Sequence, residues 1–243
     1  MLISDYTFDR FIIGQSNMMA RAMAYGVADL VGDRSQIVYI YGDTGLGKTH
    51  LLHAIGNNIL KYDASRSVVC VSAEIFCEEF ILALRAHDVQ DFRAKYKSTD
   101  VLLIDNVQFF DGKDTIQDEV LCLFEALEHT GKLIVLTSSI SPYEFSCVDN
   151  RLLSRLKSAT ILEILKPDFE LRKKILLERT DLSLWEKHPE LDDVLVLLAT
   201  KIKDDIRGLE GALYHLTMMA EILNEPITVK FAKDVLKNVL KKK

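Results

Sequence analysis

The sequence has no long apolar run, and this absence excludes a membrane-spanning helix. Apolar residues never continue for the roughly 18 positions that a membrane-spanning helix needs, and charged residues make up 27% of the 243 residues. The N-terminus, Met1–Arg10, contains Asp5 and Asp9 and no apolar h-region, so it does not form a secretory signal. We therefore expect a cytoplasmic protein without a membrane span.

Disulfide and metal-binding patterns are also missing. The cysteines form no C-x-x-C pair and lie in apolar segments, which favours reduced, buried core thiols. The cysteines are Cys70, Cys77, Cys122 and Cys147. His50 and His53 are close in sequence, but no carboxylate stands at metal-ligand spacing beside them, so a structural role is favoured.

The chain lacks an excess of positive charge. Its formal charge of −6 gives no overall attraction for a polyanion, so a nucleic-acid contact requires a local patch. From Thr228 onward six lysines, the last being Lys241, Lys242 and Lys243, oppose only Asp234. This tail therefore carries +5 and leaves −11 on the rest. We interpret the tail as a solvated helix end that complements the helix dipole.

Short apolar clusters alternate with longer helical patterns, and this alternation predicts a parallel α/β sheet. The clusters typical of strands are at 37–41, 68–71, 101–104, 133–136 and 160–164. A helix from an N-cap at Ser16 to Leu30 and a second over Thr49–Leu60 are expected to pack on the sheet. Two further helices, at 73–86 and 89–96, exceed what a simple βαβ crossover requires.

Strand patterns end at Pro167. Beyond it the sequence predicts successive helices at 169–179, 190–202, 206–223 and 228–240. The chain thus divides into an α/β domain, residues 1–167, and a helical domain, residues 168–243. No repeat or flexible Gly/Ser linker separates them, so we expect the two parts to touch.

The strongest motif is GDTGLGKT, a full match to G-x-x-x-x-G-K-[ST] between a predicted strand and a predicted helix. Gly42, Gly45 and Gly47 allow backbone N–H groups to turn toward phosphate oxygens. Lys48 can reach the β- and γ-phosphates, and the Thr49 hydroxyl can bind Mg²⁺. The motif predicts a nucleoside-triphosphate site, because a turn without ligand leaves the lysine and threonine unexplained.

A buried strand pattern ends in a carboxylate downstream of this loop. Val101–Ile104 is followed by Asp105, which can hold a metal ion opposite Thr49. An apolar strand that ends in aspartate is a weak signal alone, but together with the phosphate loop it indicates a triphosphate bound with Mg²⁺.

The chain resembles, through nearly all its length, the AAA+ domain of the bacterial replication initiator DnaA. Residues 6–14, YTFDRFIIG, resemble the family's first segment, and residues 45–57, GLGKTHLLHAIGN, resemble its phosphate loop and helix. Residues 73–96 resemble the initiator-specific insertion, which the family uses to form a right-handed helical filament. The resemblance implies an AAA+ P-loop NTPase fold: an αβα sandwich on a parallel five-stranded sheet, followed by an all-helical lid.

The resemblance also assigns residues to the nucleotide. Ile12 and Ile13 would lie beside it, as would Thr44 and Leu46 of the loop. The ligands implied are ATP or ADP with Mg²⁺, and the metal ligands would be Thr49 and Asp105.

Two arginines match functional positions of the family. Arg155, in DNRLLSR at 149–155, resembles the arginine finger that reaches the γ-phosphate of a neighbouring subunit. Arg207, in DIRGLEGAL at 205–213, resembles the sensor-2 arginine of the lid. A guanidinium suits both roles, because it is always charged and offers forked donors to phosphate oxygens.

By the same resemblance, Ile81 and Lys113 stand where the family touches single-stranded DNA of the melted origin. The structural alternatives are a core position for Ile81 and a solvated loop position for Lys113.

The chain departs from the family at two acidic positions. The family has two adjacent aspartates after the metal strand, but here Asn106 follows Asp105. An amide cannot accept a proton, so Asn106 can at best orient the attacking water, and we expect slow hydrolysis. The sensor strand, which usually ends in Ser-Asp, here continues from Thr137 into Ser138 and Ser139.

The function implied is ATP-dependent assembly of a replication initiator. Its partners would be further copies in a filament, single-stranded origin DNA, and the full-length initiator or replication regulators. One alternative is a short DnaA-like regulator of the Hda type, which the absence of an evident sliding-clamp peptide disfavours. Another is a non-hydrolysing scaffold, which Asn106 and Ser139 favour.

The printed sequence contains neither the family's helix-turn-helix domain nor its N-terminal interaction domain. We therefore expect no sequence-specific affinity of this chain for duplex origin boxes. An isolated domain and a short natural paralogue both fit the sequence.

Overall fold

The computed structural model describes residues 1–29, 36–181, 184 and 188–240 of the chain. The chain forms two compact units. Unit 1 comprises Met1–Phe11, Met19–Gly42 and Gly47–Ile164, and unit 2 comprises Ile12–Met18, Asp43–Leu46 and Leu165–Lys243. Two short segments from the first half of the chain thus join unit 2, which a sequential division at Pro167 does not anticipate.

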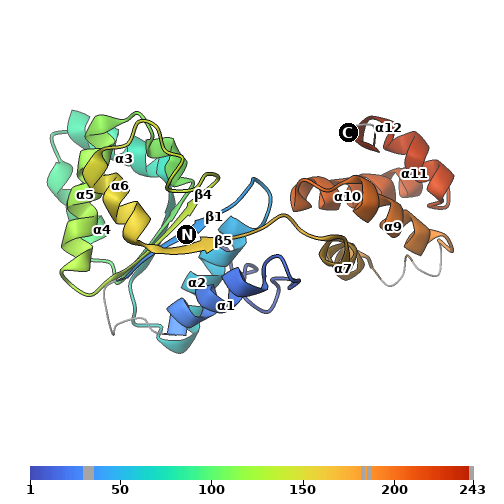
Figure 1. Ribbon diagram of the computed structural model, residues 1–243, viewed down its shortest axis with the longest axis horizontal. Coiled ribbons are helices and arrows are strands. Elements are labelled where there is room, and N and C mark those ends of the chain that lie inside the picture. Colours follow the sequence, from blue (N-terminus) through green and yellow to red (C-terminus); the bar gives the residue numbers. More distant parts are fainter. Residues whose placement is uncertain (30–35, 182–183, 185–187, 241–243) are drawn as a thin grey trace. The chain divides into compact units, whose positions relative to one another are not determined.

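Unit 1 is built on a parallel sheet of five strands in the order β2-β3-β4-β1-β5 (Figure 1). The strands are β1 (Gln36–Tyr41), β2 (Val68–Ser72), β3 (Val101–Asp105), β4 (Leu133–Ser138) and β5 (Thr160–Glu163). Strand β4 is buried along its whole length and β3 along all but its last residue, as expected for parallel strands covered on both faces. The predicted α/β fold with a parallel five-stranded sheet is confirmed.

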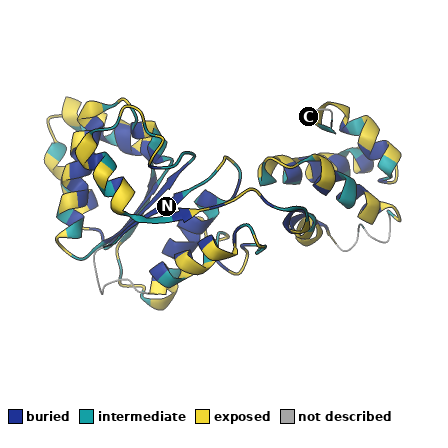
Figure 2. Ribbon diagram, viewed as in Figure 1, coloured by how far each residue is buried: buried dark blue, intermediate teal, exposed yellow. Residues whose placement is uncertain are grey.

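Helices cover both faces of this sheet. Figure 1 shows α1 (Met18–Asp29) and α2 (Lys48–Tyr62) on one side. The helices on the other side are α3 (Ala73–Arg85), α4 (Val89–Lys97), α5 (Asp114–Glu128) and α6 (Asn150–Ser158). A short 3-10 turn, η1 (Val107–Phe110), follows β3. The central strands β1, β3 and β4 are mostly buried and the edge strands β2 and β5 are only partly buried, while the outer faces of the helices are exposed (Figure 2).

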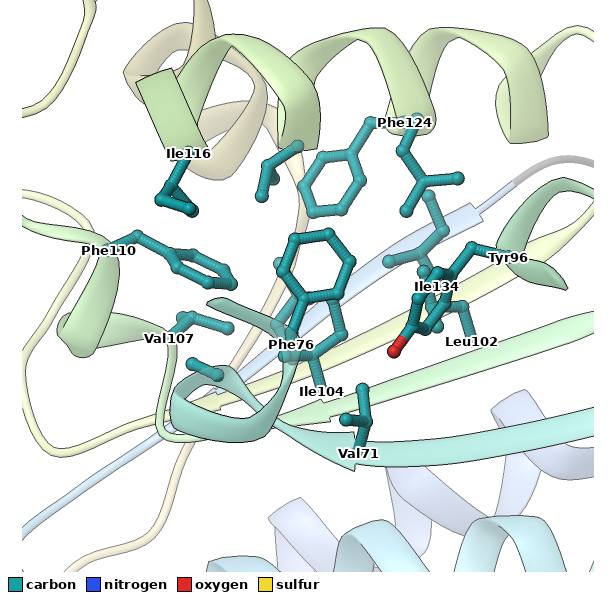
Figure 3. Close-up of a cluster of buried hydrophobic side chains, with 14 of the residues drawn as sticks. Val71, Phe76, Tyr96, Leu102, Ile104, Val107, Phe110, Ile116, Phe124 and Ile134 are labelled. Carbon is teal, nitrogen blue, oxygen red and sulfur yellow. The ribbon is translucent and has the colours of Figure 1, made fainter. Parts of the chain in front are cut away.

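Aromatic side chains fill the space between the sheet and the helices α3 to α6. Phe76 lies at the centre of this cluster, with Phe124 toward α5 and Ile104 toward the sheet (Figure 3). The ring centroids of Phe76 and Tyr96 are 5.0 Å apart, and those of Phe76 and Phe110 are 5.8 Å apart. The insertion formed by α3 and α4 is therefore part of the core of unit 1.

The regular elements described in unit 2 are helices. Its helices are α7 (Phe169–Arg179), α9 (Leu191–Lys201), α10 (Ile206–Leu223), α11 (Val229–Val235) and α12 (Lys237–Leu240). Leucines from α9 and α10, such as Leu195, Leu198 and Leu209, form a fully buried core. No helix in the described part of the chain is both long enough and apolar enough to cross a membrane.

Three sequence expectations are wrong in detail. Helix α1 begins at Met18, so Ser16 is not its N-cap; the buried Ser16 hydroxyl has no hydrogen-bond partner among the described residues. The helix expected over 228–240 is interrupted at Leu236, a buried residue between α11 and α12. Cys122 and Cys147 are exposed, because they lie on the outer face of α5 and in the loop before α6.

Some expectations concern residues outside the described part of the chain. These are the end of the first helix at Leu30 and the tail lysines Lys241, Lys242 and Lys243.

Candidate functional site

The phosphate-loop motif begins directly after β1, and its conformation requires glycine. Gly42 and Gly47 have φ of 151° and 96°, a region that side chains rarely adopt. A Cβ on Gly47 would lie 2.9 Å from the ring of Phe11, and a Cβ on Gly42 would clash with the Ile164 carbonyl oxygen. Both positions therefore exclude any side chain.

Helix α2 begins at the end of this loop and gives the site a positive potential. The first N–H groups of a helix lack intrahelical partners, and its dipole adds partial positive charge there. The first turn of α2 carries no acidic side chain that would cancel this charge. Lys48 is buried, and its Nζ donates to the Gly42 carbonyl oxygen at 2.7 Å. Backbone donors and an ammonium group thus converge where an anion is favoured.

The end of β3 meets the start of α2. The Thr49 hydroxyl donates to Asp105 Oδ2 at 2.8 Å, although 56 residues separate the two in sequence. Hydroxyl and carboxylate oxygens are the donors that Mg²⁺ takes from proteins beside phosphate and water oxygens. The residues present therefore fit a magnesium ion beside the phosphate loop.

A second hydroxyl, which sequence reasoning did not assign, also contacts the Asp105 carboxylate. Thr137, at the end of β4, is fully buried and donates to Asp105 Oδ1. The available sequence signal was a threonine at the end of an apolar strand. Its relevance depends on strand order, because only adjacent β3 and β4 bring Thr137 to Asp105.

The two positions where the family carries acids supply no carboxylate here. Asn106 has φ of 63° and ψ of 45°, and its N–H donates to Thr137 Oγ1 at 3.1 Å. The Ser139 N–H donates to Gln108 Oε1 at 3.2 Å. Amide and hydroxyl groups thus line the ends of β3 and β4 beyond Asp105.

His50 and His53 attach the N-terminal segment to α2. His50 Nε2 lies 2.8 Å from the Thr7 carbonyl oxygen, and the Tyr6 ring stacks on His50 with centroids 4.8 Å apart. The Ile3 N–H donates to His53 Nδ1 at 3.1 Å, and burial lowers the pKa of His53. The predicted structural role of this pair is confirmed. The described residues contain no cluster of three or more metal-binding side chains.

Arg155 lies in α6 and pairs with carboxylates of its own chain. Its Nη2 lies 3.1 Å from Glu125 Oε1, and its Nη1 bonds Glu128 Oε2. Both glutamates are in the last turn of α5 or near it. The neighbouring Arg151 forms a separate set of ion pairs with Asp118 and Asp149 at 3.0 Å.

Ile81 lies in α3 of the insertion, and Lys113 lies between η1 and α5. Ile81 is 42% exposed on α3, so the core alternative for this residue is wrong. Lys113 Nζ lies 3.8 Å from the centroid of the Phe109 ring. Burial raises the pKa of the Cys77 thiol to about 11, and the Lys113 ammonium opposes this shift.

The middle of the phosphate loop belongs to unit 2 and contacts the start of α10. The Ile206 N–H donates to the Gly45 carbonyl oxygen at 3.2 Å, and Thr44 is exposed while Leu46 is buried. Gly45 has φ of 78°, and a Cβ there would lie 2.8 Å from Asp205 Cβ. Asp205 accepts from the Gly208 N–H as the N-cap of α10. This contact was not anticipated from the sequence.

The remaining candidate residues of unit 2 lie at two places. Arg207 is exposed in the first turn of α10. The Ile12 carbonyl oxygen accepts from Asn17 Nδ2 at 3.0 Å, and the Ile13 carbonyl oxygen accepts from Lys174 Nζ at 3.3 Å. The side chains of Ile12 and Ile13 are both half-buried.

Comparisons with known proteins identify the family of this chain. The model of the bacterial DnaA ATPase domain matches residues 2–163. Domain III of the replication initiation protein DnaA from Thermotoga maritima is 34% identical, with 99% of each chain covered and a TM-score of 0.90.

Two further similar structures are longer chains. AMPPCP-bound DnaA from Aquifex aeolicus is 31% identical over 100% of this chain and 74% of that one, with a TM-score of 0.81. A replication initiator DnaA bound to AMPPCP and single-stranded DNA is 31% identical over 92% of this chain and 69% of that one, with a TM-score of 0.78. The chain therefore belongs to the family of bacterial DnaA ATPase domains.

Proposed function

We propose that this chain binds ATP and ADP with Mg²⁺, and that the bound nucleotide controls its assembly with further copies on single-stranded origin DNA. The observation that carries this proposal is the arrangement of Lys48, Thr49 and Asp105 around the N-terminus of α2. The similar structures with bound AMPPCP support it.

Different groups of the site would bind different parts of the nucleotide. Backbone N–H groups of the loop and the first turn of α2 hold phosphate oxygens, and Lys48 neutralises charge at the β- and γ-phosphates. A bound Mg²⁺ would offset the remaining phosphate charge, and Thr49 with Asp105 would hold it. By the resemblance to the family, Arg207 at the start of α10 would sense the γ-phosphate.

Assembly depends on Arg155 in this proposal. A guanidinium that docks on the γ-phosphate of a neighbouring copy finds its anion with ATP and loses it with ADP. Single-stranded DNA would contact Lys113 and the exposed Ile81 in this proposal. The DnaA structure with bound single-stranded DNA supports single-stranded DNA as a ligand.

Asn106 and Ser139 favour a second candidate function, an ATP-dependent scaffold that does not hydrolyse. Neither side chain can accept a proton from the attacking water, so the ATP state would persist until nucleotide exchange. Turnover measurements separate this function from a slow ATPase.

Calorimetry with ATP and ADP in Mg²⁺ tests the binding proposal. Wild-type protein is expected to bind both nucleotides, and Lys48→Ala is expected to abolish binding because it removes the ammonium from the β/γ-phosphate position. Lys61→Ala, an exposed lysine in the last turn of the same helix, is the matched control. If the wild-type protein gives no heat of binding with either nucleotide at high concentration, the proposal is wrong.

A further inference from the structure

We propose that Thr137 is a positioning residue that fixes the carboxylate of Asp105 for Mg²⁺-dependent nucleotide binding. This inference rests on the proposed function and extends it to a residue outside the phosphate loop and β3. Thr137 is the last but one residue of β4 and is fully buried, although its hydroxyl is polar. Burying a hydroxyl costs free energy unless it is hydrogen-bonded, so the hydrogen-bond partners of Thr137 indicate its role.

The sheet brings Thr137 to Asp105. Strands β3 and β4 pair in parallel with Ile104 opposite Leu136, so the next residues, Asp105 and Thr137, leave the ladder side by side. On its other side β4 pairs with β1, where Thr137 stands opposite Ile40. The pairing with β1 thus holds the backbone of Thr137, and the complete burial of the residue limits the movement of its side chain.

The direction of the Thr137 hydroxyl proton follows from its hydrogen bonds. The Asn106 N–H donates to Thr137 Oγ1 at 3.1 Å and occupies one of its lone pairs. The single hydroxyl proton is then donated to Asp105 Oδ1. The backbone of the residue after Asp105 therefore aims the threonine back at the Asp105 carboxylate.

Two hydroxyls on different elements then define the carboxylate plane. Thr49 on α2 donates to Oδ2 at 2.8 Å, and Thr137 on β4 donates to Oδ1. Without the Thr137 donor, Oδ1 would lose this hydrogen bond. The carboxylate could then rotate out of the orientation in which it and the Thr49 hydroxyl face the same metal ion. A metal ligand held by such an outer partner is preorganised, and the loss of the partner costs about 10- to 100-fold in metal affinity.

Thr137→Val is the discriminating variant, because valine keeps the shape and the branched Cβ but has no hydroxyl. Thr137→Ser restores the hydroxyl with one methyl group fewer. ATP binding is measured by calorimetry in Mg²⁺ and in EDTA, and the ratio of the two affinities reports the contribution of the metal ion. Circular dichroism and thermal melting establish that each variant folds. Thr137→Ala replaces Thr137→Val if the latter does not fold.

We expect Thr137→Val to lower the Mg²⁺/EDTA affinity ratio about tenfold and to leave the affinity in EDTA within about twofold of wild type. Thr137→Ser is expected to retain most of the wild-type ratio. An equal loss in Mg²⁺ and EDTA would show a purely structural residue, and an unchanged ratio would show no role; either result overturns the inference.

The failure of this inference is distinguishable from failure of the proposed function. Wild-type protein that binds ATP more tightly in Mg²⁺ than in EDTA, with the same ratio in Thr137→Val, rejects only the role of Thr137. Wild-type protein that binds no ATP under either condition rejects the proposed function itself.

Discussion

Asn106 combines an unusual backbone conformation with a position directly after the metal-binding carboxylate. Its φ of 63° lies in the left-handed region, where asparagine and aspartate are enriched among non-glycine residues. Aspartate can therefore replace it without backbone strain, and the N–H group that donates to Thr137 stays in place. This position allows the chemistry of the side chain to be changed while the fold is kept.

Asn106→Asp is predicted to raise ATP turnover without tightening ATP binding. The added carboxylate can accept a proton from water in line with the γ-phosphate, and positioned proton transfer contributes about 10² to 10⁴ in rate. Phosphate release is measured at rising protein concentration, alongside ATP affinity by calorimetry. Asn106→Gly, which also accommodates the left-handed backbone but adds no base, is the matched control and is expected not to exceed the wild-type rate.

A second explanation of slow turnover is delivery of Arg155 from a neighbouring copy. If the rates of wild type and Asn106→Asp coincide at every concentration, including those at which the protein assembles, the missing carboxylate does not limit hydrolysis. Separation of the two rates only in the assembled range would show that both the base and the arginine are needed.

At the scale of elements, the insertion α3–α4 is held together by buried and half-buried charges. Glu79 on α3 accepts from the Tyr96 hydroxyl at 2.7 Å and from Lys95 Nζ at 2.6 Å. Arg93 on α4 forms a two-pronged pair with Glu119 on α5, which is buried. The first set joins the two helices of the insertion, and the second joins the insertion to the body of unit 1.

Glu79→Gln is predicted to destabilise unit 1 by about 1 kcal/mol at neutral pH, because a partly exposed charged hydrogen bond is weakened by solvent. Burial alone would raise the pKa of Glu79, but hydrogen bonds from Lys95 and Tyr96 outweigh it and lower the pKa. The stabilisation is therefore complete above the ordinary glutamate pKa of 4.5 and is lost as the pH falls through the lower folded value.

Thermal melting from pH 7 down to about pH 3 checks this sign. The difference in Tm between wild type and Glu79→Gln should shrink as the pH falls, and Glu78→Gln, an exposed neighbour on the same helix, should show little difference throughout. A difference that grows toward acid pH would contradict the assigned role of Glu79.

The sequence predicts the elements of this fold better than their junctions. The five apolar clusters correspond to the five strands, and the helices at 169–179 and 206–223 are found with those bounds. These elements have strong apolar periodicity, which local sequence reports directly. The interruption at Leu236 has no Pro or Gly to mark it. The burial of this residue is a tertiary effect that a local pattern does not contain.

The candidate site also combines residues that local sequence predicts with residues that it does not. Lys48, Thr49 and Asp105 follow from motif and spacing, because each motif carries its own backbone geometry. Thr137 and Asp205 do not, because their partners are fixed by strand order and by the loop that meets α10. Contacts between segments distant in sequence depend on topology, which no single window of residues reveals.

At the scale of the whole molecule, the proposed assembly joins two different surfaces of identical copies. The nucleotide of one copy would meet Arg155 of the next, and such heterologous contacts give open filaments when the rotation between copies does not close. Within a single chain, Arg155 is already paired with Glu125 and Glu128 on α5. A γ-phosphate must therefore compete with two carboxylates for the same guanidinium.

This competition makes Arg155 the decisive residue for ATP-dependent assembly. We predict that ATP promotes self-association more than ADP does, and that Arg155→Ala removes the difference while ATP affinity stays nearly unchanged. Loss of the ion pairs with Glu125 and Glu128 should cost about 1 kcal/mol or less of stability, because the pairs are partly exposed. Sedimentation at matched protein concentrations in ATP and in ADP measures the mass distribution.

Two further variants separate the phosphate contact from the fold of α6. Arg151→Ala removes an exposed arginine of the same helix with ion pairs of its own, and it should retain the ATP dependence. Arg155→Lys keeps a positive charge for the glutamates but loses the forked donors that fit a phosphate, so it should fold like wild type and assemble weakly. Equal mass distributions of the wild type in ATP and ADP would count against a role for the γ-phosphate in assembly. If Arg151→Ala and Arg155→Ala lose the ATP dependence of self-association equally, α6 contributes only general positive charge. The two arginines differ in the position of the guanidinium and not in its chemistry.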